Sequence, residues 1–243
     1  MNKLSFSTLT LLACAVALPS ASFAQGSFGI GVTASTLGAG IQAAASVTKY
    51  SNIRGGFNAF NYTDSFTKDG INYSGTLKLR SGQVTWDQYF PHLGGFHISP
   101  GALIYNGNQG NATANVPAGQ TFSLGSTTYY SSSANPVNGT GAITFRKAAP
   151  MVLIGFGNLV PRSSRHIGVS LEAGVVFEGS PNAKLSLAGS SCLVSATAGC
   201  VNAATDPTVQ ANLLSEQTKL NNDLGPFKYY PIVSLGISYK FGK

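Results

Sequence analysis

The C-terminal segment of this chain alternates between two kinds of side chain with almost no interruption. The apolar set is Phe227, Tyr229, Pro231, Val233, Leu235, Ile237, Tyr239 and Phe241. The residues between them are Lys228, Tyr230, Ile232, Ser234, Gly236, Ser238 and Lys240. Because successive side chains of a strand point to opposite faces, the segment predicts a β-strand with one apolar face and one mostly polar or small face.

Similar alternation recurs along the chain. The segments concerned are residues 28–36, 41–48, 53–62, 71–90, 96–105, 147–158 and 166–178. The sequence offers no second layer that could cover so many apolar faces, so lipid is the expected cover. The pattern predicts an all-β fold, an eight-stranded antiparallel up-and-down transmembrane β-barrel. Ten strands stay open as an alternative, if residues 121–145 also cross the membrane.

The connection lengths predict which end of the barrel faces outward. Residues 49–52, 91–95 and 159–165 are short connections, whereas residues 107–144 and 179–226 are long ones. Short periplasmic turns and long extracellular loops are typical of outer-membrane barrels.

Two local patterns add detail to these elements. The apolar phase of the fourth segment changes near Ser81, which predicts either a β-bulge or an upper half that stands clear of the membrane. In the last long loop, Asp206 and Pro207 predict a helix that runs to about Asp223 and packs over the barrel mouth, or acts as a lid for a ligand.

The N-terminus has the pattern of a secretory signal peptide. Lys3 precedes an apolar stretch over residues 4–18, and Ser22-Phe23-Ala24 supplies a small-x-small cleavage site. We therefore expect residues 1–24 to be removed, leaving residues 25–243 as one outer-membrane β-barrel domain. Lipidation at Cys14 is the alternative. Either way, the chain is expected in the bacterial outer membrane.

The amino-acid composition restricts the classes of binding partner that we expect. Charged residues make up 9% of the chain, against about 25% in a typical soluble domain. The formal net charge of +7 is scattered, which argues against nucleic-acid binding and favours outer-membrane lipid and anionic lipopolysaccharide as partners. Cys192 and Cys200 are expected to form a disulfide in an exported chain. The sequence predicts no metal site and no cofactor.

Charged residues on the polar faces predict a network inside the barrel. An eight-stranded barrel is just wide enough for side chains to fill its interior, where unpaired charges are costly. We expect the following residues to point inward: Arg54, Asp87, His97, Glu172, Glu178, Lys228, Lys240 and, less clearly placed by the pattern, Lys147. Arg54 is expected to pair with Glu172 or Asp87.

Residues 234–241 resemble the closing strand of the OmpA-like transmembrane barrel, within the outer-membrane β-barrel superfamily. The resemblance implies that Tyr239 and Phe241 belong to the signal that the barrel assembly machinery reads. Two further residues follow Phe241, which departs from the strictly terminal form of that signal.

One short motif raises an enzymatic alternative. His97-Ile98-Ser99 resembles the His-x-Ser of outer-membrane lipid A deacylases, in which Ser is the nucleophile and His the base. Pro100 stands where Asn follows in that family. We expect a structural or surface-interaction protein that acts through its extracellular loops, without catalysis. A narrow channel or carrier for small solutes is the second hypothesis, and a lipid A-modifying enzyme is the third.

Overall fold

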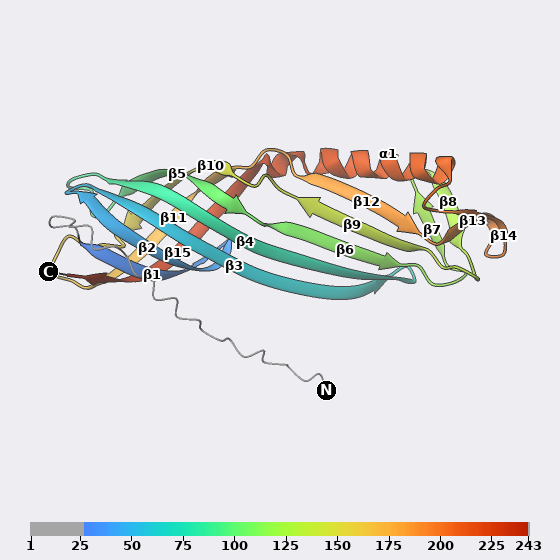
Figure 1. Ribbon diagram of the computed structural model, residues 1–243, viewed down its shortest axis with the longest axis horizontal. Coiled ribbons are helices and arrows are strands. Elements are labelled where there is room, and N and C mark those ends of the chain that lie inside the picture. The colour runs from blue at the N-terminus through green and yellow to red at the C-terminus, as the bar shows by residue number, and fades with distance from the viewer. Residues whose placement is uncertain (1–26, 243) are drawn as a thin grey trace, which may run out of the picture.

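A computed structural model describes residues 27–242, and the predicted signal peptide lies outside the described residues. The described part of the chain is all-β apart from the helix α1 (Pro207–Asp223) and the 3-10 helix η1 (Gly225–Lys228). The strands are β1 (Phe28–Ser35), β2 (Gly38–Thr48), β3 (Ser51–Lys68), β4 (Ile71–Tyr89), β5 (His97–Asn106), β6 (Gln109–Asn115), β7 (Thr121–Leu124), β8 (Thr127–Ser131), β9 (Asn138–Thr144), β10 (Ala149–Gly157), β11 (Ile167–Phe177), β12 (Asn182–Ala188), β13 (Ser190–Ser195), β14 (Ala198–Asn202) and β15 (Tyr229–Phe241). The molecule is elongated (Figure 1).

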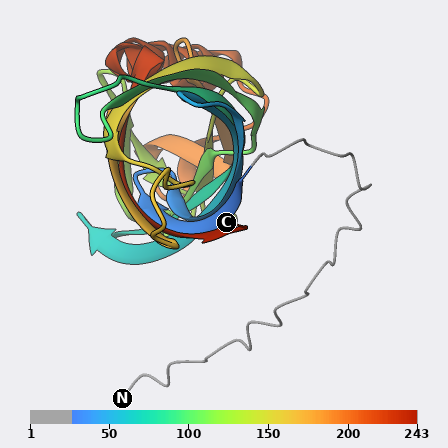
Figure 2. The same cartoon turned by 90° about the vertical axis from the view of Figure 1, so that its left-hand side faces the viewer.

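One set of strands closes into a ring. Antiparallel pairings run from β1 through β2, β3, β4, β5, β10, β11 and β15, and β15 pairs back with β1. Figure 2 shows this ring from the end that carries the C-terminus. These strands correspond to the segments that alternation predicts, while residues 121–145 form β7, β8 and β9 outside the ring.

The ring's outer face is apolar. In β11, for example, Val169 and Leu171 are 58% and 56% exposed, whereas Ser170 and Glu172 between them are buried. This arrangement places apolar side chains outside and polar ones inside, which is the reverse of a water-soluble barrel.

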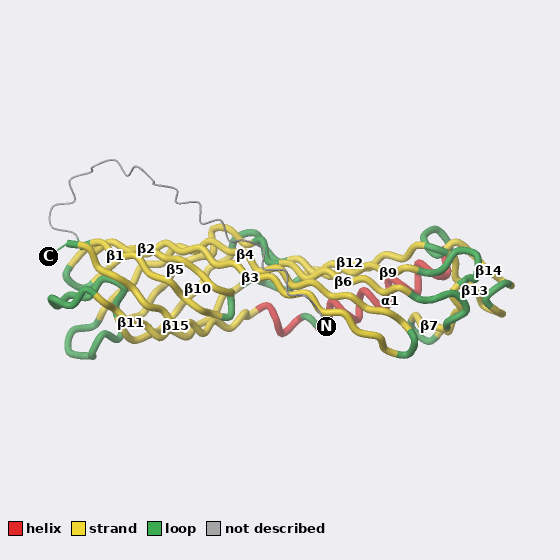
Figure 3. The backbone as a smooth tube through the Cα atoms, turned by 90° about the horizontal axis from the view of Figure 1, so that it is seen from below, coloured by secondary structure: helices red, strands yellow, loops and turns green. Residues whose placement is uncertain are grey.

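A second body of structure, which we call the extension, rises from the end of the ring opposite the C-terminus (Figure 3). It comprises residues 60–80, 107–144 and 179–224. Here β3 and β4 continue past their ring neighbours, and β6, β9 and β12 join them in the order β3-β4-β6-β9-β12. The hairpins β7-β8 and β13-β14 form a separate four-stranded sheet at the far end.

The polarity of the sheet inverts where the ring gives way to the extension. In the ring part of β4, Val84 and Trp86 face outward, and Asp87 faces inward and is buried. Past Ser81, the outward positions of β4 become polar and the inward ones become apolar, as Lys78 and Leu79 illustrate. On the outer face, hydroxyl groups pair across β3 and β4, with Ser65 and Ser74 oxygens 2.9 Å apart.

This inversion explains the predicted change of phase in the fourth segment. The pairing of β4 with β3 is continuous through Ser81, so the phase change reflects different surroundings rather than a bulge in that ladder. The pairing with β5 does shift its register, between Gly82 and Gln83, just before β5 ends. The predicted bulge is therefore present only in the pairing of β4 with β5, and the part of β4 before Ser81 belongs to the extension.

Helix α1 begins and ends where the sequence predicts, although it does not cover the ring. Asp206 caps it by accepting hydrogen bonds from the backbone of Thr208 and Val209. The helix lies along β12 instead of over the barrel mouth (Figure 1). Within residues 27–242, no helix is long and apolar enough to cross a membrane.

Side-chain amides of α1 protect the free edge of β12. Asn221 Oδ1 accepts a hydrogen bond of 2.7 Å from the Ala183 backbone, and Gln217 Oε1 accepts one of 2.9 Å from Leu185. The extension also has its own hydrophobic core. Its buried members are Ile71, Val116, Phe122, Leu124, Tyr129, Val137, Ala203, Val209 and Leu213. The extension is therefore a packed structure rather than a set of loose loops.

Candidate functional site in the barrel lumen

Arg54 of β3 lies at the centre of a buried charged cluster inside the ring. Its Nη2 is 2.9 Å from Asp87 Oδ1 of β4, and its Nη1 is 2.8 Å from Glu172 Oε2 of β11. Each of the three side chains is at most 3% exposed. Thr85 and Gln42 accept further hydrogen bonds from the guanidinium, at 3.2 and 3.3 Å. Opposite walls of the ring are therefore tied together through one cation.

His97 of β5 completes the cluster. Its Nε2 lies 2.9 Å from Glu172 Oε1, and its Nδ1 lies 3.2 Å from the carbonyl oxygen of Gly95. Both neighbouring oxygen atoms can accept a hydrogen bond, so the imidazole of His97 makes both contacts as a donor when each of its nitrogen atoms carries a proton.

Two other predicted lumen residues lie apart from this cluster, at the two ends of the ring. Glu178 is buried just beyond β11 and accepts a hydrogen bond of 3.1 Å from Asn106. Lys240 is buried near the C-terminal end of the ring and donates to the Ser163 carbonyl at 2.7 Å.

The prediction that Lys228 points into the lumen is wrong. The 3-10 helix η1 interrupts the alternation before β15, and Lys228 is exposed, with its amine 5.1 Å from the Tyr229 ring centre. Lys147 is likewise exposed, because β10 begins only at Ala149.

An apolar layer fills the lumen between the charged cluster and the extension. Its buried members are Leu37, Leu103, Ala149, Met151, Leu153, Val176 and Ile232. A partial signal for this layer was present in the sequence, because apolar residues occupy inward positions that are mostly polar elsewhere in the ring segments. These residues are Leu103, Met151, Leu153, Val176 and Ile232.

The loop between β10 and β11 packs into the other end of the ring. Leu159 and Val160 are buried there against Ala44. Arg162 holds the loop in place, since its guanidinium donates 2.7 Å to Ser46 Oγ and 2.6 Å to Asn52 Oδ1. Sequence reasoning missed Arg162, because nothing in the pattern of a short turn indicates that it folds back under the barrel.

The His-x-Ser motif is not arranged as a nucleophile and base. Ser99 is fully buried, and its hydroxyl has no hydrogen-bond partner among residues 27–242. Both His97 ring nitrogens are taken up by Gly95 and Glu172. The described residues also contain no cluster of His, Cys, Asp and Glu that could hold a metal ion.

The remaining predicted residues lie outside the lumen. The disulfide between Cys192 and Cys200 is confirmed, and it joins β13 to β14 at directly paired positions in the extension. Tyr239 and Phe241 face outward near the end of β15, with ring centres 5.0 Å apart. They lie beside Phe28, whose ring centre is 6.2 Å from that of Phe241.

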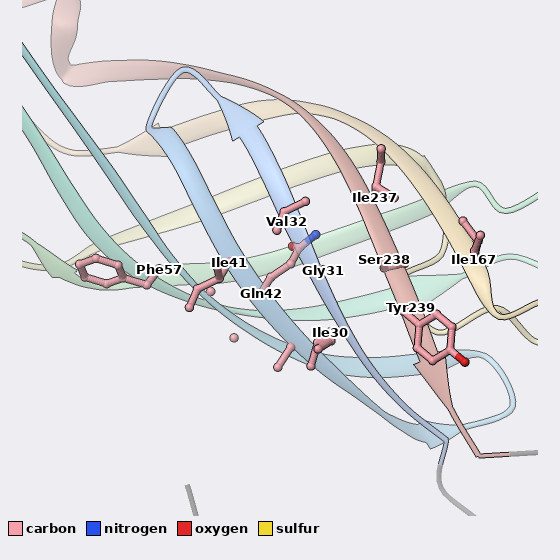
Figure 4. Close-up of a pocket in the computed structure, with 13 residues that line it drawn as sticks. Ile30, Gly31, Val32, Ile41, Gln42, Phe57, Ile167, Ile237, Ser238 and Tyr239 are labelled. Carbon is pink, nitrogen blue, oxygen red and sulfur yellow. The ribbon is translucent and has the colours of Figure 1, made fainter. Parts of the chain in front are cut away.

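The outer wall of the ring carries an apolar groove of about 680 Å³ (Figure 4). Ile30 pairs with Ala43, which pairs with Gly55 on the next strand. Because the side chains at 43 and 55 are small or absent, the outer surface is recessed at this point. Ile41 and Phe57 border it. The groove is thus a dent in an apolar surface.

Comparison with solved structures identifies relatives of this fold. The crystal structure of Acinetobacter baumannii CarO matches with a TM-score of 0.55 and 21% sequence identity, over 88% of this chain and 97% of that chain. The structure of CarO2 from the same organism matches with a TM-score of 0.56 and 20% identity, over 88% and 98%. This chain has a CarO-like fold. No family model and no curated protein matches its sequence.

Proposed function

We propose that this protein is an eight-stranded outer-membrane barrel that presents a folded module at the cell surface, with no catalytic role. The polarity inversion at Ser81 carries the proposal. An apolar outer face fits lipid, and a polar outer face with an apolar interior fits water. The inversion thus supports a ring that lies within the membrane and an extension that lies outside the cell. The CarO-like fold and the outward aromatic residues Tyr239 and Phe241 support this placement.

The filled lumen supports a role other than transport. A solute would have to pass the apolar layer around Met151, the charged cluster around Arg54 and the loop that holds Leu159. These three barriers lie in series along the ring. A surface role also fits the extension, which has its own core, a disulfide and a helix that protects its sheet edge.

Two partners follow from this location. Outer-membrane lipid and lipopolysaccharide would cover the apolar wall, including the groove of Figure 4. The barrel assembly machinery would recognise the end of β15, where Tyr239 and Phe241 lie. The OmpA-like resemblance of this strand stays a prediction.

A narrow channel is the second candidate, and one observation favours it. The charged cluster crosses the middle of the ring and would line a polar path if the apolar layer moved. Recordings across a planar lipid bilayer separate the two. The proposal predicts no conductance from the purified full chain, both for the wild type and for Glu172→Gln. Discrete openings that change with Glu172→Gln would contradict it and support the channel.

A further inference from the structure

The inner face of the extension holds a trough of about 370 Å³ that neither the ring nor the buried core of the extension occupies. It crosses β3, β4, β6, β9 and β12, and reaches Leu220 of α1. A volume of this size is in the range of small-molecule sites, which start at about 300 Å³. The charged cluster in the lumen contributes none of its lining residues.

A band of very small residues makes the trough. Gly75, Ala112 and Gly141 lie side by side on three neighbouring strands, and Gly110 lies next to them. A Cβ atom placed on Gly75 would meet no heavy atom within 4 Å. The backbone itself therefore forms a flat floor, suited to a planar or slender apolar group.

The walls are apolar and open to water. Tyr62 and Leu77 border one side, and Leu185 and Leu220 border the other. Tyr62 is 55% exposed, as is Phe66 two positions further along the same face of β3. Large apolar side chains that face water in a folded module often mark a binding surface, because leaving them uncovered costs free energy.

The charge that lines the trough is negative. Among the described residues that line it, Asp64 alone is charged. Asp64 stands on the same face of β3 as Tyr62 and lies opposite Gly75 across the ladder. A carboxylate beside an aromatic ring attracts a cation, through Coulomb attraction to the former and cation–π contact with the latter. It repels an anionic ligand.

We propose that this trough binds small amphipathic cations. The apolar body of the ligand would lie on the floor of Gly75, Ala112 and Gly141, and its ammonium or iminium group would lie between Asp64 and Tyr62. The proposal rests on the proposed function, because only an extension outside the membrane would expose the trough to water-borne ligands. It adds to that function a ligand class and a site.

The planar cationic dye proflavine tests the proposal. The full chain is placed in nanodiscs of zwitterionic lipid, and dye binding is followed by fluorescence anisotropy, with empty nanodiscs as the blank. We expect saturable binding to the wild type. Asp64→Asn should raise the Kd of the dye about fivefold, which is the fold-change expected from losing one exposed ion pair. The matched control Asp69→Asn, in the turn of the same hairpin, should change it less than about twofold.

A second pair of variants tests the floor. Gly75→Val fills the trough where there is space for the new side chain, and should weaken binding about tenfold or more. Asn61→Val, on the outer face of β3, is its control and should bind as the wild type does. A change of gel mobility on heating, equal to that of the wild type, checks that each variant is folded.

Three results would overturn the assignment. Wild-type binding no stronger than to empty nanodiscs, or full binding by Gly75→Val, would remove the site. Equal binding by wild type and Asp64→Asn would remove the cationic ligand class. None of these results bears on conductance or on which residues face lipid, so failure of this inference is distinguishable from failure of the proposed function.

Discussion

Replacing Arg54 by Leu should destabilise the barrel strongly. The substitution leaves the carboxylates of Asp87 and Glu172 buried, at 1% and 3% exposed, with their shared cation removed. Breaking a buried ion pair from one side costs about 3–5 kcal/mol, because the stranded charge keeps its desolvation penalty. His97 still contacts Glu172 and offsets part of the loss. We therefore expect a loss of about 4 kcal/mol, or nearly a thousandfold in the folded-to-unfolded ratio.

Urea unfolding in lipid vesicles measures this loss. Trp86 is the single tryptophan of the chain and lies on the outer face of the ring. Its fluorescence should change when unfolding replaces the lipid around it by water. Arg80→Leu is the matched control, because it removes an exposed arginine from the neighbouring strand β4. It should stay within about 0.5 kcal/mol of the wild type. The loss of unfolding free energy for Arg54→Lys should lie between those of the two leucine variants, because lysine keeps the positive charge but lacks the planar guanidinium that bonds both carboxylates. A loss below about 1 kcal/mol for Arg54→Leu would refute the reasoning.

Three further outcomes are expected. Asp206→Ala removes the cap of α1 and should speed hydrogen exchange in its first turn by an amount equivalent to about 1 kcal/mol, with unchanged exchange in the ring as the control. Replacing Cys192 and Cys200 together by Ser should loosen β13 and β14 by about 2–3 kcal/mol in the same experiment, and protection equal to the wild type would contradict it. Burial raises the pKa of Glu178 to about 7, so the folded chain holds this proton more tightly than the unfolded chain. Stability should fall by about 1–3 kcal/mol as the pH rises from 4.5 to 8, and Glu178→Gln should abolish this fall in urea titrations.

Alternation predicts the ring strands closely because the same two-sided environment acts along each of them. The predicted segment 166–178 corresponds to β11 (Ile167–Phe177), and the predicted helix from Pro207 to Asp223 matches α1. The helix is predictable from Asp206 and Pro207 because capping is local chemistry. The inward set that includes Arg54 and Glu172 follows from side-chain parity alone.

The extension could not be predicted, because its sheet joins strands that are far apart in the chain. β6 and β9 have no strong alternation, since their inner face is mostly Gly and Ala, and β12 alternates over only 7 residues. Parity also does not tell what an inward position meets, which is why the apolar layer around Leu103 was missed. Lys228 was misplaced for a related reason, because alternation cannot reveal a 3-10 turn that breaks a strand before β15.

Cysteine labelling on both sides of the inversion tests the central claim most directly. Phe57 and Thr63 occupy the same outer face of β3, below and above the point where polarity changes. Cys192 and Cys200 are bonded to each other, and Cys14 lies in the predicted signal peptide, so a new cysteine is the reactive one in the mature chain. On intact cells, a membrane-impermeant maleimide should label Thr63→Cys, and should label Phe57→Cys only after the cells are dissolved and the protein is unfolded. Equal labelling of the two on intact cells, or labelling of Phe57→Cys alone, would contradict the account.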